Sequence, residues 1–274
     1  MTHFNAHIIP FVSILLYLIA AFLQYFSIVS LVFSNAAGIA RLMFLRTLIP
    51  VLSVLAILLH AFWLHQKIDL PSGQDINFFN MLSFVMWFMA VVLILTIFRQ
   101  AFQNLRIFVF PVAALSIGIT IFFPLSPVLK PMTGHPEEWL HVWLAALTLG
   151  FVFIAMLQAV LLFVQDRWLH HYQNLPALIK KMPPIESMER LLFETILIVF
   201  FLLSIIFGSS FYFFQHIFQS PLLQKTLLVL VAWVLLFVLL IGRYFFGWRG
   251  KKAIIYTLLT FLTLALIYFL PIYQ

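Results

Sequence analysis

The chain has 274 residues, of which 65% are hydrophobic and 8% are charged, and its mean hydropathy is +1.13. A soluble domain cannot bury this much apolar surface, so the composition excludes a soluble globular protein and indicates an integral membrane protein. The chain contains no cysteine, which excludes disulfides, thiolate metal sites and thiol exchange by the chain itself. Any redox function therefore needs a cofactor or a partner.

Eight apolar runs are long enough to cross a hydrocarbon layer, which takes about 20 helical residues. They lie near residues 8–33, 44–64, 78–98, 106–123, 139–164, 191–214, 222–242 and 253–272. No Lys or Arg precedes the first run, which is longer than the apolar part of a secretory signal, so we expect it to stay as a helix. The sequence predicts an all-α, polytopic membrane bundle of about eight transmembrane helices, forming a single membrane domain over residues 1–274.

Lysine and arginine are concentrated in alternate gaps between these runs. Three of the 15 lie in gaps on one side: Lys67, Lys130 and Lys225. The others lie in the gaps after the first, third, fifth and seventh runs: Arg41, Arg46, Arg99, Arg106, Arg167, Lys180, Lys181, Arg190, Arg243, Arg249, Lys251 and Lys252. By the positive-inside rule this second group is cytoplasmic, so both chain ends are predicted on the external, periplasmic side. The net charge of +7 then faces the lipid bilayer's inner headgroups, and nucleic acid is not implied.

Two kinds of signal mark the gaps. Pro183 and Pro184 predict the start of the sixth helix, and Glu189 follows in its first turns, where a carboxylate is favoured. In the external gaps, Pro71-Ser72-Gly73 predicts a turn, and the four prolines of residues 124–138 predict an irregular cap over the bundle.

Histidine placement is the most specific chemical signal. Seven of the nine histidines are predicted at or near the external face: His3, His7, His60, His65, His135, His141 and His216. His60 and His141 differ from the rest because each lies within a predicted helix. His60 lies one turn before the outer end of the second helix, with Trp63 as an interfacial residue, and His141 lies just below Trp139 at the outer start of the fifth. Both imidazoles are therefore expected at a similar depth near the outer leaflet.

Two neutral imidazoles on neighbouring helices at matched depth can ligate a haem iron from opposite faces. The 33 phenylalanines would suit a slot for the porphyrin. The other interpretation is that each histidine hydrogen-bonds a neighbouring helix or an interfacial water, as polar residues in membrane bundles usually do. Spacing alone leaves both interpretations open.

Three segments resemble the cytochrome c assembly family of haem-handling membrane proteins, the CcsA, CcmC and HemX type. The stretch MPPIESMERLLF, residues 182–193, resembles the segment that opens the family's core, and GWRGKKA, residues 247–253, resembles its cytoplasmic turn before the last helix. His141 in the stretch WLHVW resembles the family's histidine at the outer start of the matching helix. The chain as a whole is similar to a short bacterial inner-membrane branch, the YpjD-like proteins. The resemblance implies a multi-pass inner-membrane protein that holds haem b through His60 and His141 and works with cytochrome c assembly partners.

The chain departs from the family pattern at two places. Members that deliver haem carry an external motif W-G-x-x-W-x-W-D between the sixth and seventh helices, whereas residues 211–221 here are aromatic without tryptophan or aspartate. Late in the seventh helix, where relatives often have a histidine, the chain has Gly242 and Arg243. These departures affect the external platform that presents haem and leave the pair of His60 and His141. His216 is a third potential ligand, with a solvated loop histidine as the alternative.

The sequence therefore predicts a protein that binds or hands over haem near its outer face, as a binding protein rather than an enzyme. The alternative function is a non-haem scaffold or stabilising partner of another membrane complex, in which the histidines are structural. A small-molecule permease is disfavoured, because the sequence has no internal repeat and no charged residue in the middle of a predicted span.

Overall fold

The computed structural model describes residues 2–30, 36–96, 99–130, 136–171, 176–180, 182–213 and 222–269. The helices in these ranges are α1 (Thr2–Ser30), α2 (Ala36–Ile68), α3 (Phe78–Leu95), α4 (Gln100–Phe122), α5 (Pro136–His171), α6 (Ala177–Lys180), α7 (Ile185–Phe213), α8 (Leu222–Phe246) and α9 (Lys251–Phe269). Three short strands are β1 (Asp69–Leu70), β2 (Gly73–Asp75) and β3 (Leu129–Lys130). The predicted all-α membrane bundle is confirmed, while the side of the membrane on which the termini lie stays a prediction.

Seven helices in the described ranges, α1 to α5, α7 and α8, are long and apolar enough to cross a membrane. The eighth predicted run corresponds to α9, and its predicted end at residue 272 lies outside the described residues. Apolar runs of this length become helices in lipid because a helix pairs its backbone N–H and C=O groups within the segment itself.

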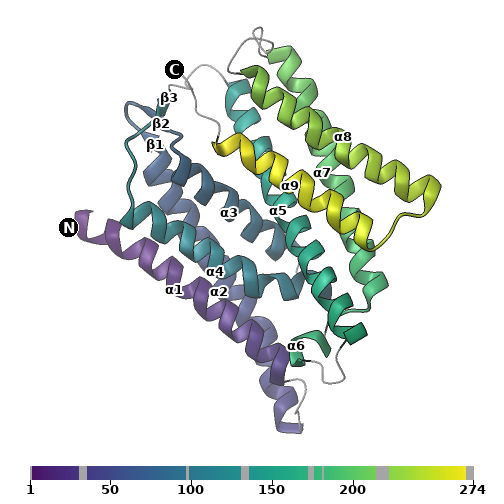
Figure 1. The fold of residues 1–274 in the computed structure, drawn as a ribbon. Coiled ribbons are helices and arrows are strands. Elements are labelled where there is room, and N and C mark those ends of the chain that lie inside the picture. Colours follow the sequence, from purple (N-terminus) through teal and green to yellow (C-terminus); the bar gives the residue numbers. More distant parts are fainter. Residues whose placement is uncertain are drawn as a thin grey trace. The chain divides into compact units, whose positions relative to one another are not determined.

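The chain forms two compact units. Unit 1 comprises Met1–Thr133 and Asn174–Pro183, and unit 2 comprises Gly134–Gln173 and Pro184–Gln274. In unit 1, α1 and α3 each pack against both α2 and α4, which closes a ring of four helices (Figure 1). In unit 2, α5 and α8 each pack against both α7 and α9, which closes a second ring. The single domain predicted over residues 1–274 stays a prediction.

Small residues occupy buried positions throughout both bundles. The buried alanines of the two units are Ala20, Ala21, Ala56, Ala90, Ala113, Ala114, Ala146, Ala155, Ala159, Ala232 and Ala253. Small side chains at helix contacts let backbones approach closely, which is how helices gain packing energy where lipid supplies no hydrophobic drive. Larger side chains such as Tyr17, Met89 and Phe110 fill the space that remains in the unit 1 core.

The two gaps of unit 1 that were predicted to be external form a three-stranded antiparallel sheet in the order β1-β2-β3. Leu70 pairs with Gly73, so Pro71 and Ser72 form the two-residue turn that the sequence predicts. The irregular cap predicted for residues 124–138 is wrong in part, because Leu129 and Lys130 pair with Asp75 and Gln74 as a third strand.

The carboxylate of Asp75 explains this difference. Asp75 is 5% exposed, and its two oxygens accept hydrogen bonds from the backbone N–H groups of Asn77 and Val128 and from the side-chain amides of Asn77 and Asn80. The Val128 N–H lies 2.9 Å from Oδ1 and ties the segment after α4 to the hairpin. Asn77 also caps α3, since its side chain accepts the Asn80 N–H.

Candidate functional site

His60 lies in the core of unit 1. It is fully buried on α2, and both ring nitrogens contact polar side chains of other helices. Nδ1 lies 3.3 Å from the hydroxyl oxygen of Tyr17 on α1, and Nε2 lies 2.9 Å from Oγ of Ser83 on α3. The tyrosine and imidazole rings meet edge to face, with centroids 5.8 Å apart. His60 therefore links three helices of this unit.

Ser116 on α4 extends these contacts to a fourth helix. Its hydroxyl donates to the carbonyl of Ala113 at 2.8 Å, and its Oγ lies 3.3 Å from Oγ of Ser83. A hydroxyl carries a single proton, so Ser116 shares its proton between the Ala113 carbonyl and Oγ of Ser83. The imidazole tautomer decides which ring nitrogen of His60 donates and which accepts in the contacts with Ser83 and Tyr17.

Trp63 is packed inside the helical bundle of unit 1. It is 6% exposed, and its Nε1 donates to Oγ1 of Thr120 on α4 at 3.0 Å. α2 continues to Ile68, about two turns past His60, so its predicted end one turn after His60 is too early. The interfacial position of Trp63 stays a prediction. The polar groups around His60 thus form part of the packed interior of unit 1.

The other predicted ligands lie elsewhere. His141 lies near the start of α5, in unit 2, and is half-buried. The proposed pair therefore takes one histidine from each unit, and its role as a pair of axial ligands stays a prediction. His216 lies outside the described residues.

The partners of His60 would suit a haem ligand if Ser83 gave up its hydrogen bond to Nε2. A metal-bound histidine keeps a hydrogen bond from its second ring nitrogen, which fixes the orientation of the ring. The Tyr17 oxygen, 3.3 Å from Nδ1, can accept that bond in the tautomer that carries the imidazole proton on Nδ1. Ser83 is the partner that Nε2 would give up. His60 would then hold the iron, with Tyr17 as the positioning residue.

The segments around Glu189 and Gly250, which carry the family resemblance, touch in unit 2. α7 begins directly after Pro183 and Pro184, as predicted. Glu189 is 9% exposed, and its Oε1 accepts the backbone N–H of Gly250 at 2.6 Å. Gly250 has a φ of +53°, in the left-handed region that favours glycine. Sequence reasoning treated Glu189 only as a carboxylate at a helix start, because nothing local points to a partner 61 residues away.

Gly242 and Arg243 seat the tryptophan of the same turn. The Trp248 N–H donates to the carbonyl of Gly242 at 3.1 Å, and Nη1 of Arg243 donates to the Trp248 carbonyl at 3.2 Å. A Cβ on Gly242 would lie 2.3 Å from Cδ2 of Trp248, so the indole needs a glycine there. The Arg243 guanidinium also lies over the ring of Phe193, 4.5 Å from its centroid. At these two positions, where the chain departs from the family pattern, Gly242 and Arg243 therefore hold Trp248 in place.

Arg106 is a buried cation rather than a residue of a gap. α4 begins at Gln100, so Arg106 lies within the helix and is 2% exposed. Its Nη2 donates to the carbonyl of Leu93 at 3.2 Å, in the last turn of α3, where carbonyl groups lack helical partners and the helix dipole favours a cation. Arg106 joins the end of α3 to α4, which the sequence pattern of alternating gaps did not reveal.

These features define a multi-pass, α-helical membrane protein. The family described as "Cytochrome C assembly protein" matches residues 75–271, and the chain belongs to it. The chain is similar to "Inner membrane protein YpjD" of Escherichia coli, in strain K12 and in the O6:H1 and O157:H7 strains, at 27% identity over 226 residues. These residues cover 82% of this chain and 85% of each relative. No solved structure matches.

The family match covers the two histidines unequally. His141, Glu189 and Gly250 lie within residues 75–271, whereas His60 and Tyr17 precede them. The chain is a multi-pass inner-membrane protein, as predicted.

Proposed function

We propose that this protein binds haem b, or hands it over, near the periplasmic face of the inner membrane in support of cytochrome c assembly. His60 and His141 are the proposed axial ligands, with His216 as a third potential ligand. When bound, haem supplies an iron centre that exchanges electrons and accepts axial nitrogen ligands. The chain acts on it by binding and orienting, and not as an enzyme.

Family membership supports this proposal, and the surroundings of His60 carry it. A fully buried imidazole with a tyrosine hydroxyl at Nδ1 has the partner that orients a metal-bound histidine. The apolar bundle would exclude water from the iron, and Phe110, whose ring centroid lies 5.5 Å from that of Tyr17, extends the aromatic surface beside the imidazole.

The test is an absorption spectrum of the full chain purified in mild detergent from haem-replete cells, oxidised and then reduced with dithionite. We expect a stoichiometric Soret band in the wild type, lost or shifted in both His60→Ala and His141→Ala. Two exposed histidines on the same helices serve as matched controls: His65→Ala on α2 and His170→Ala on α5 should leave the spectrum unchanged. A wild type without a Soret band, even after added haem, would overturn the proposal.

A non-haem scaffold is the second candidate function, and one observation favours it. Both nitrogens of His60 already have protein partners, so the imidazole needs no metal to be satisfied. In that case His60→Ala lowers the thermal unfolding midpoint of a protein that has no haem spectrum at all.

A further inference from the structure

The connection between α8 and α9 combines exposed cations with exposed aromatic rings. We propose that this surface, residues 243–252 and named here the α8–α9 turn, docks the headgroups of anionic phospholipids. The proposal is independent of haem binding.

The α8–α9 turn carries an uncompensated positive charge. Residues 243–252 include four cations and no acidic residue. Arg249, Lys251 and Lys252 are exposed, and within the described residues Arg249 and Lys251 have no hydrogen bond or ion pair. Lys252 lies over the Trp248 ring, with Nζ 4.3 Å from its centroid. Three neighbouring cations are thus available to an anion.

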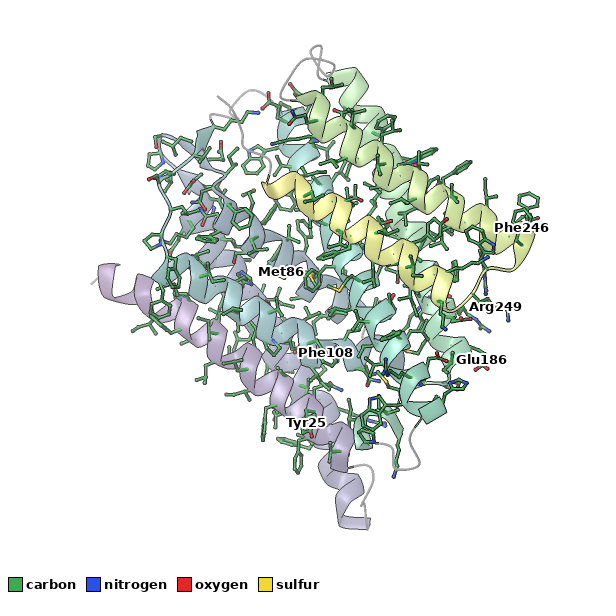
Figure 2. The ribbon with its side chains drawn as sticks, viewed as in Figure 1. Tyr25, Met86, Phe108, Glu186, Phe246 and Arg249 are labelled. Atoms are coloured by element: carbon green, nitrogen blue, oxygen red, sulfur yellow. The ribbon has the colours of Figure 1, made fainter. Side chains whose placement is uncertain are left out.

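Aromatic side chains surround the end of α8. Tyr244, Phe245 and Phe246 are 84%, 71% and 73% exposed. Successive residues of a helix point about 100° apart, so these rings cover the helix end on most sides. The apolar span of α8 ends at Phe246, and Figure 2 shows Phe246 at the tip of the helix with Arg249 projecting from the connection beside it. Aromatic rings at the end of an apolar span are typical of the headgroup region of a membrane.

The turn is held in one conformation by its own contacts. Glu189 accepts the Gly250 N–H, Arg243 donates to the Trp248 carbonyl, and Gly247 has a φ of +62°. Arg243 and Glu189 therefore shape the turn. The three exposed cations, Arg249, Lys251 and Lys252, remain for a ligand. A backbone held by such contacts loses little entropy on binding, so the cations project from a fixed loop.

The occupant follows from charge and position. A phospholipid with a phosphate and no compensating ammonium matches three exposed cations, and its acyl chains can lie against the rings at the end of α8. A small soluble anion would use the cations but not the aromatic residues. Anionic lipid is therefore the ligand that uses both parts of the surface.

The experiment is native mass spectrometry of the purified full chain in detergent, titrated with phosphatidylglycerol or with phosphatidylcholine. The test variant combines Arg249→Gln, Lys251→Gln and Lys252→Gln. The matched control removes three cations elsewhere, with Arg46→Gln, Lys67→Gln and Lys180→Gln. We expect the wild type and the control to bind phosphatidylglycerol more tightly than phosphatidylcholine, and the test variant to lose about fivefold in affinity for phosphatidylglycerol per cation removed.

The proposal is overturned if the test variant binds phosphatidylglycerol like the wild type, if the wild type does not distinguish the two lipids, or if excess inorganic phosphate displaces the lipid. Thermal unfolding without added lipid checks that the triple variant is folded. If it is not, the single variants Arg249→Gln and Lys251→Gln replace it, each with an expected loss of about fivefold. Absorption spectra of the same samples report on haem separately.

Discussion

The carboxylate of Glu189 and the backbone N–H of Gly250 are joined by a hydrogen bond of 2.6 Å, although the residues are 61 positions apart. This contact joins two segments that are separate motifs in the sequence. It fixes the connection between α8 and α9 to the start of α7, and it satisfies a carboxylate that is almost completely buried.

Replacing Glu189 by alanine should destabilise unit 2. The substitution removes a hydrogen bond to a charged acceptor and leaves the Gly250 N–H without a partner, so the free energy of unfolding should fall by about 1.5–3 kcal/mol. Chemical denaturation in detergent measures this. Glu186→Ala, at an exposed position of the same helix, is the control and should change stability by less than about 0.5 kcal/mol. Equal effects of the two substitutions would show that the contact with Gly250 contributes nothing.

Gly242→Ala should also destabilise the protein, because the new methyl group would overlap the Trp248 ring. The expected cost is about 1–3 kcal/mol, typical of overpacking. Gly208→Ala on α7 is the matched control: a Cβ there meets nothing within 4 Å, so this change should stabilise the helix by about 0.5–1 kcal/mol. In a Trp248→Ala background the cost of Gly242→Ala should disappear. A cost that persists there would assign the effect to something other than the indole.

Asp75→Asn tests the hydrogen bonds that close the three-stranded sheet. An asparagine presents an NH₂ group to donors that now face a carboxylate oxygen, so at least one donor loses its acceptor. We expect a loss of about 2–4 kcal/mol in the free energy of unfolding. Asp69→Asn is the control, since Asp69 is exposed and pairs only with His65 at the surface. Hydrogen exchange at Val128 should rise in Asp75→Asn alone; an unchanged rate would contradict the assignment.

The positions of the helices and of the turns marked by proline were predictable from the sequence. The polar contacts between helices were not. The apolar runs gave the helices because lipid leaves a long apolar segment no other stable backbone arrangement. The turn at Pro71 and Ser72 and the start of α7 were predictable because proline acts locally. Arg106 was misassigned because its acceptor, the Leu93 carbonyl, belongs to another helix.

The neighbours of His60 illustrate the same limit. Its position in a helix followed from hydropathy, but Tyr17 and Ser83 lie 43 and 23 residues away in sequence, with no pattern linking them to the histidine. Whether His60 is a ligand or a structural residue depends on those two partners. Histidine spacing alone does not contain that information.

Ser83→Ala and Tyr17→Phe should separate these roles. If His60 binds iron through Nε2, Ser83→Ala frees that nitrogen and keeps stoichiometric haem, while Tyr17→Phe removes the positioning partner and weakens haem binding by about 10–100-fold. Haem titration followed at the Soret band measures both. Ser53→Ala is the control, because its buried hydroxyl donates to the carbonyl of Ile49 on its own helix, α2. Loss of haem in Ser83→Ala with full binding in Tyr17→Phe would reverse the assigned roles.

The predicted topology can be tested with single cysteines, since the chain has none. Ser72 lies in the exposed turn of the sheet, and Arg249 lies in the α8–α9 turn. With both termini external, Ser72→Cys should react with a membrane-impermeant maleimide on intact cells. Arg249→Cys should react only after the membrane is permeabilised. The opposite labelling pattern would invert the topology and place the basic gaps outside.

The bond between Asp75 and Val128 also bears on how unit 1 is assembled. Asp75 precedes α3, and Val128 follows α4, 53 residues later. During vectorial insertion the carboxylate gains its last donor only after both helices have entered the bilayer. The sheet is therefore completed only after the hairpin of α3 and α4 has formed, and it holds these two helices in register from outside the lipid.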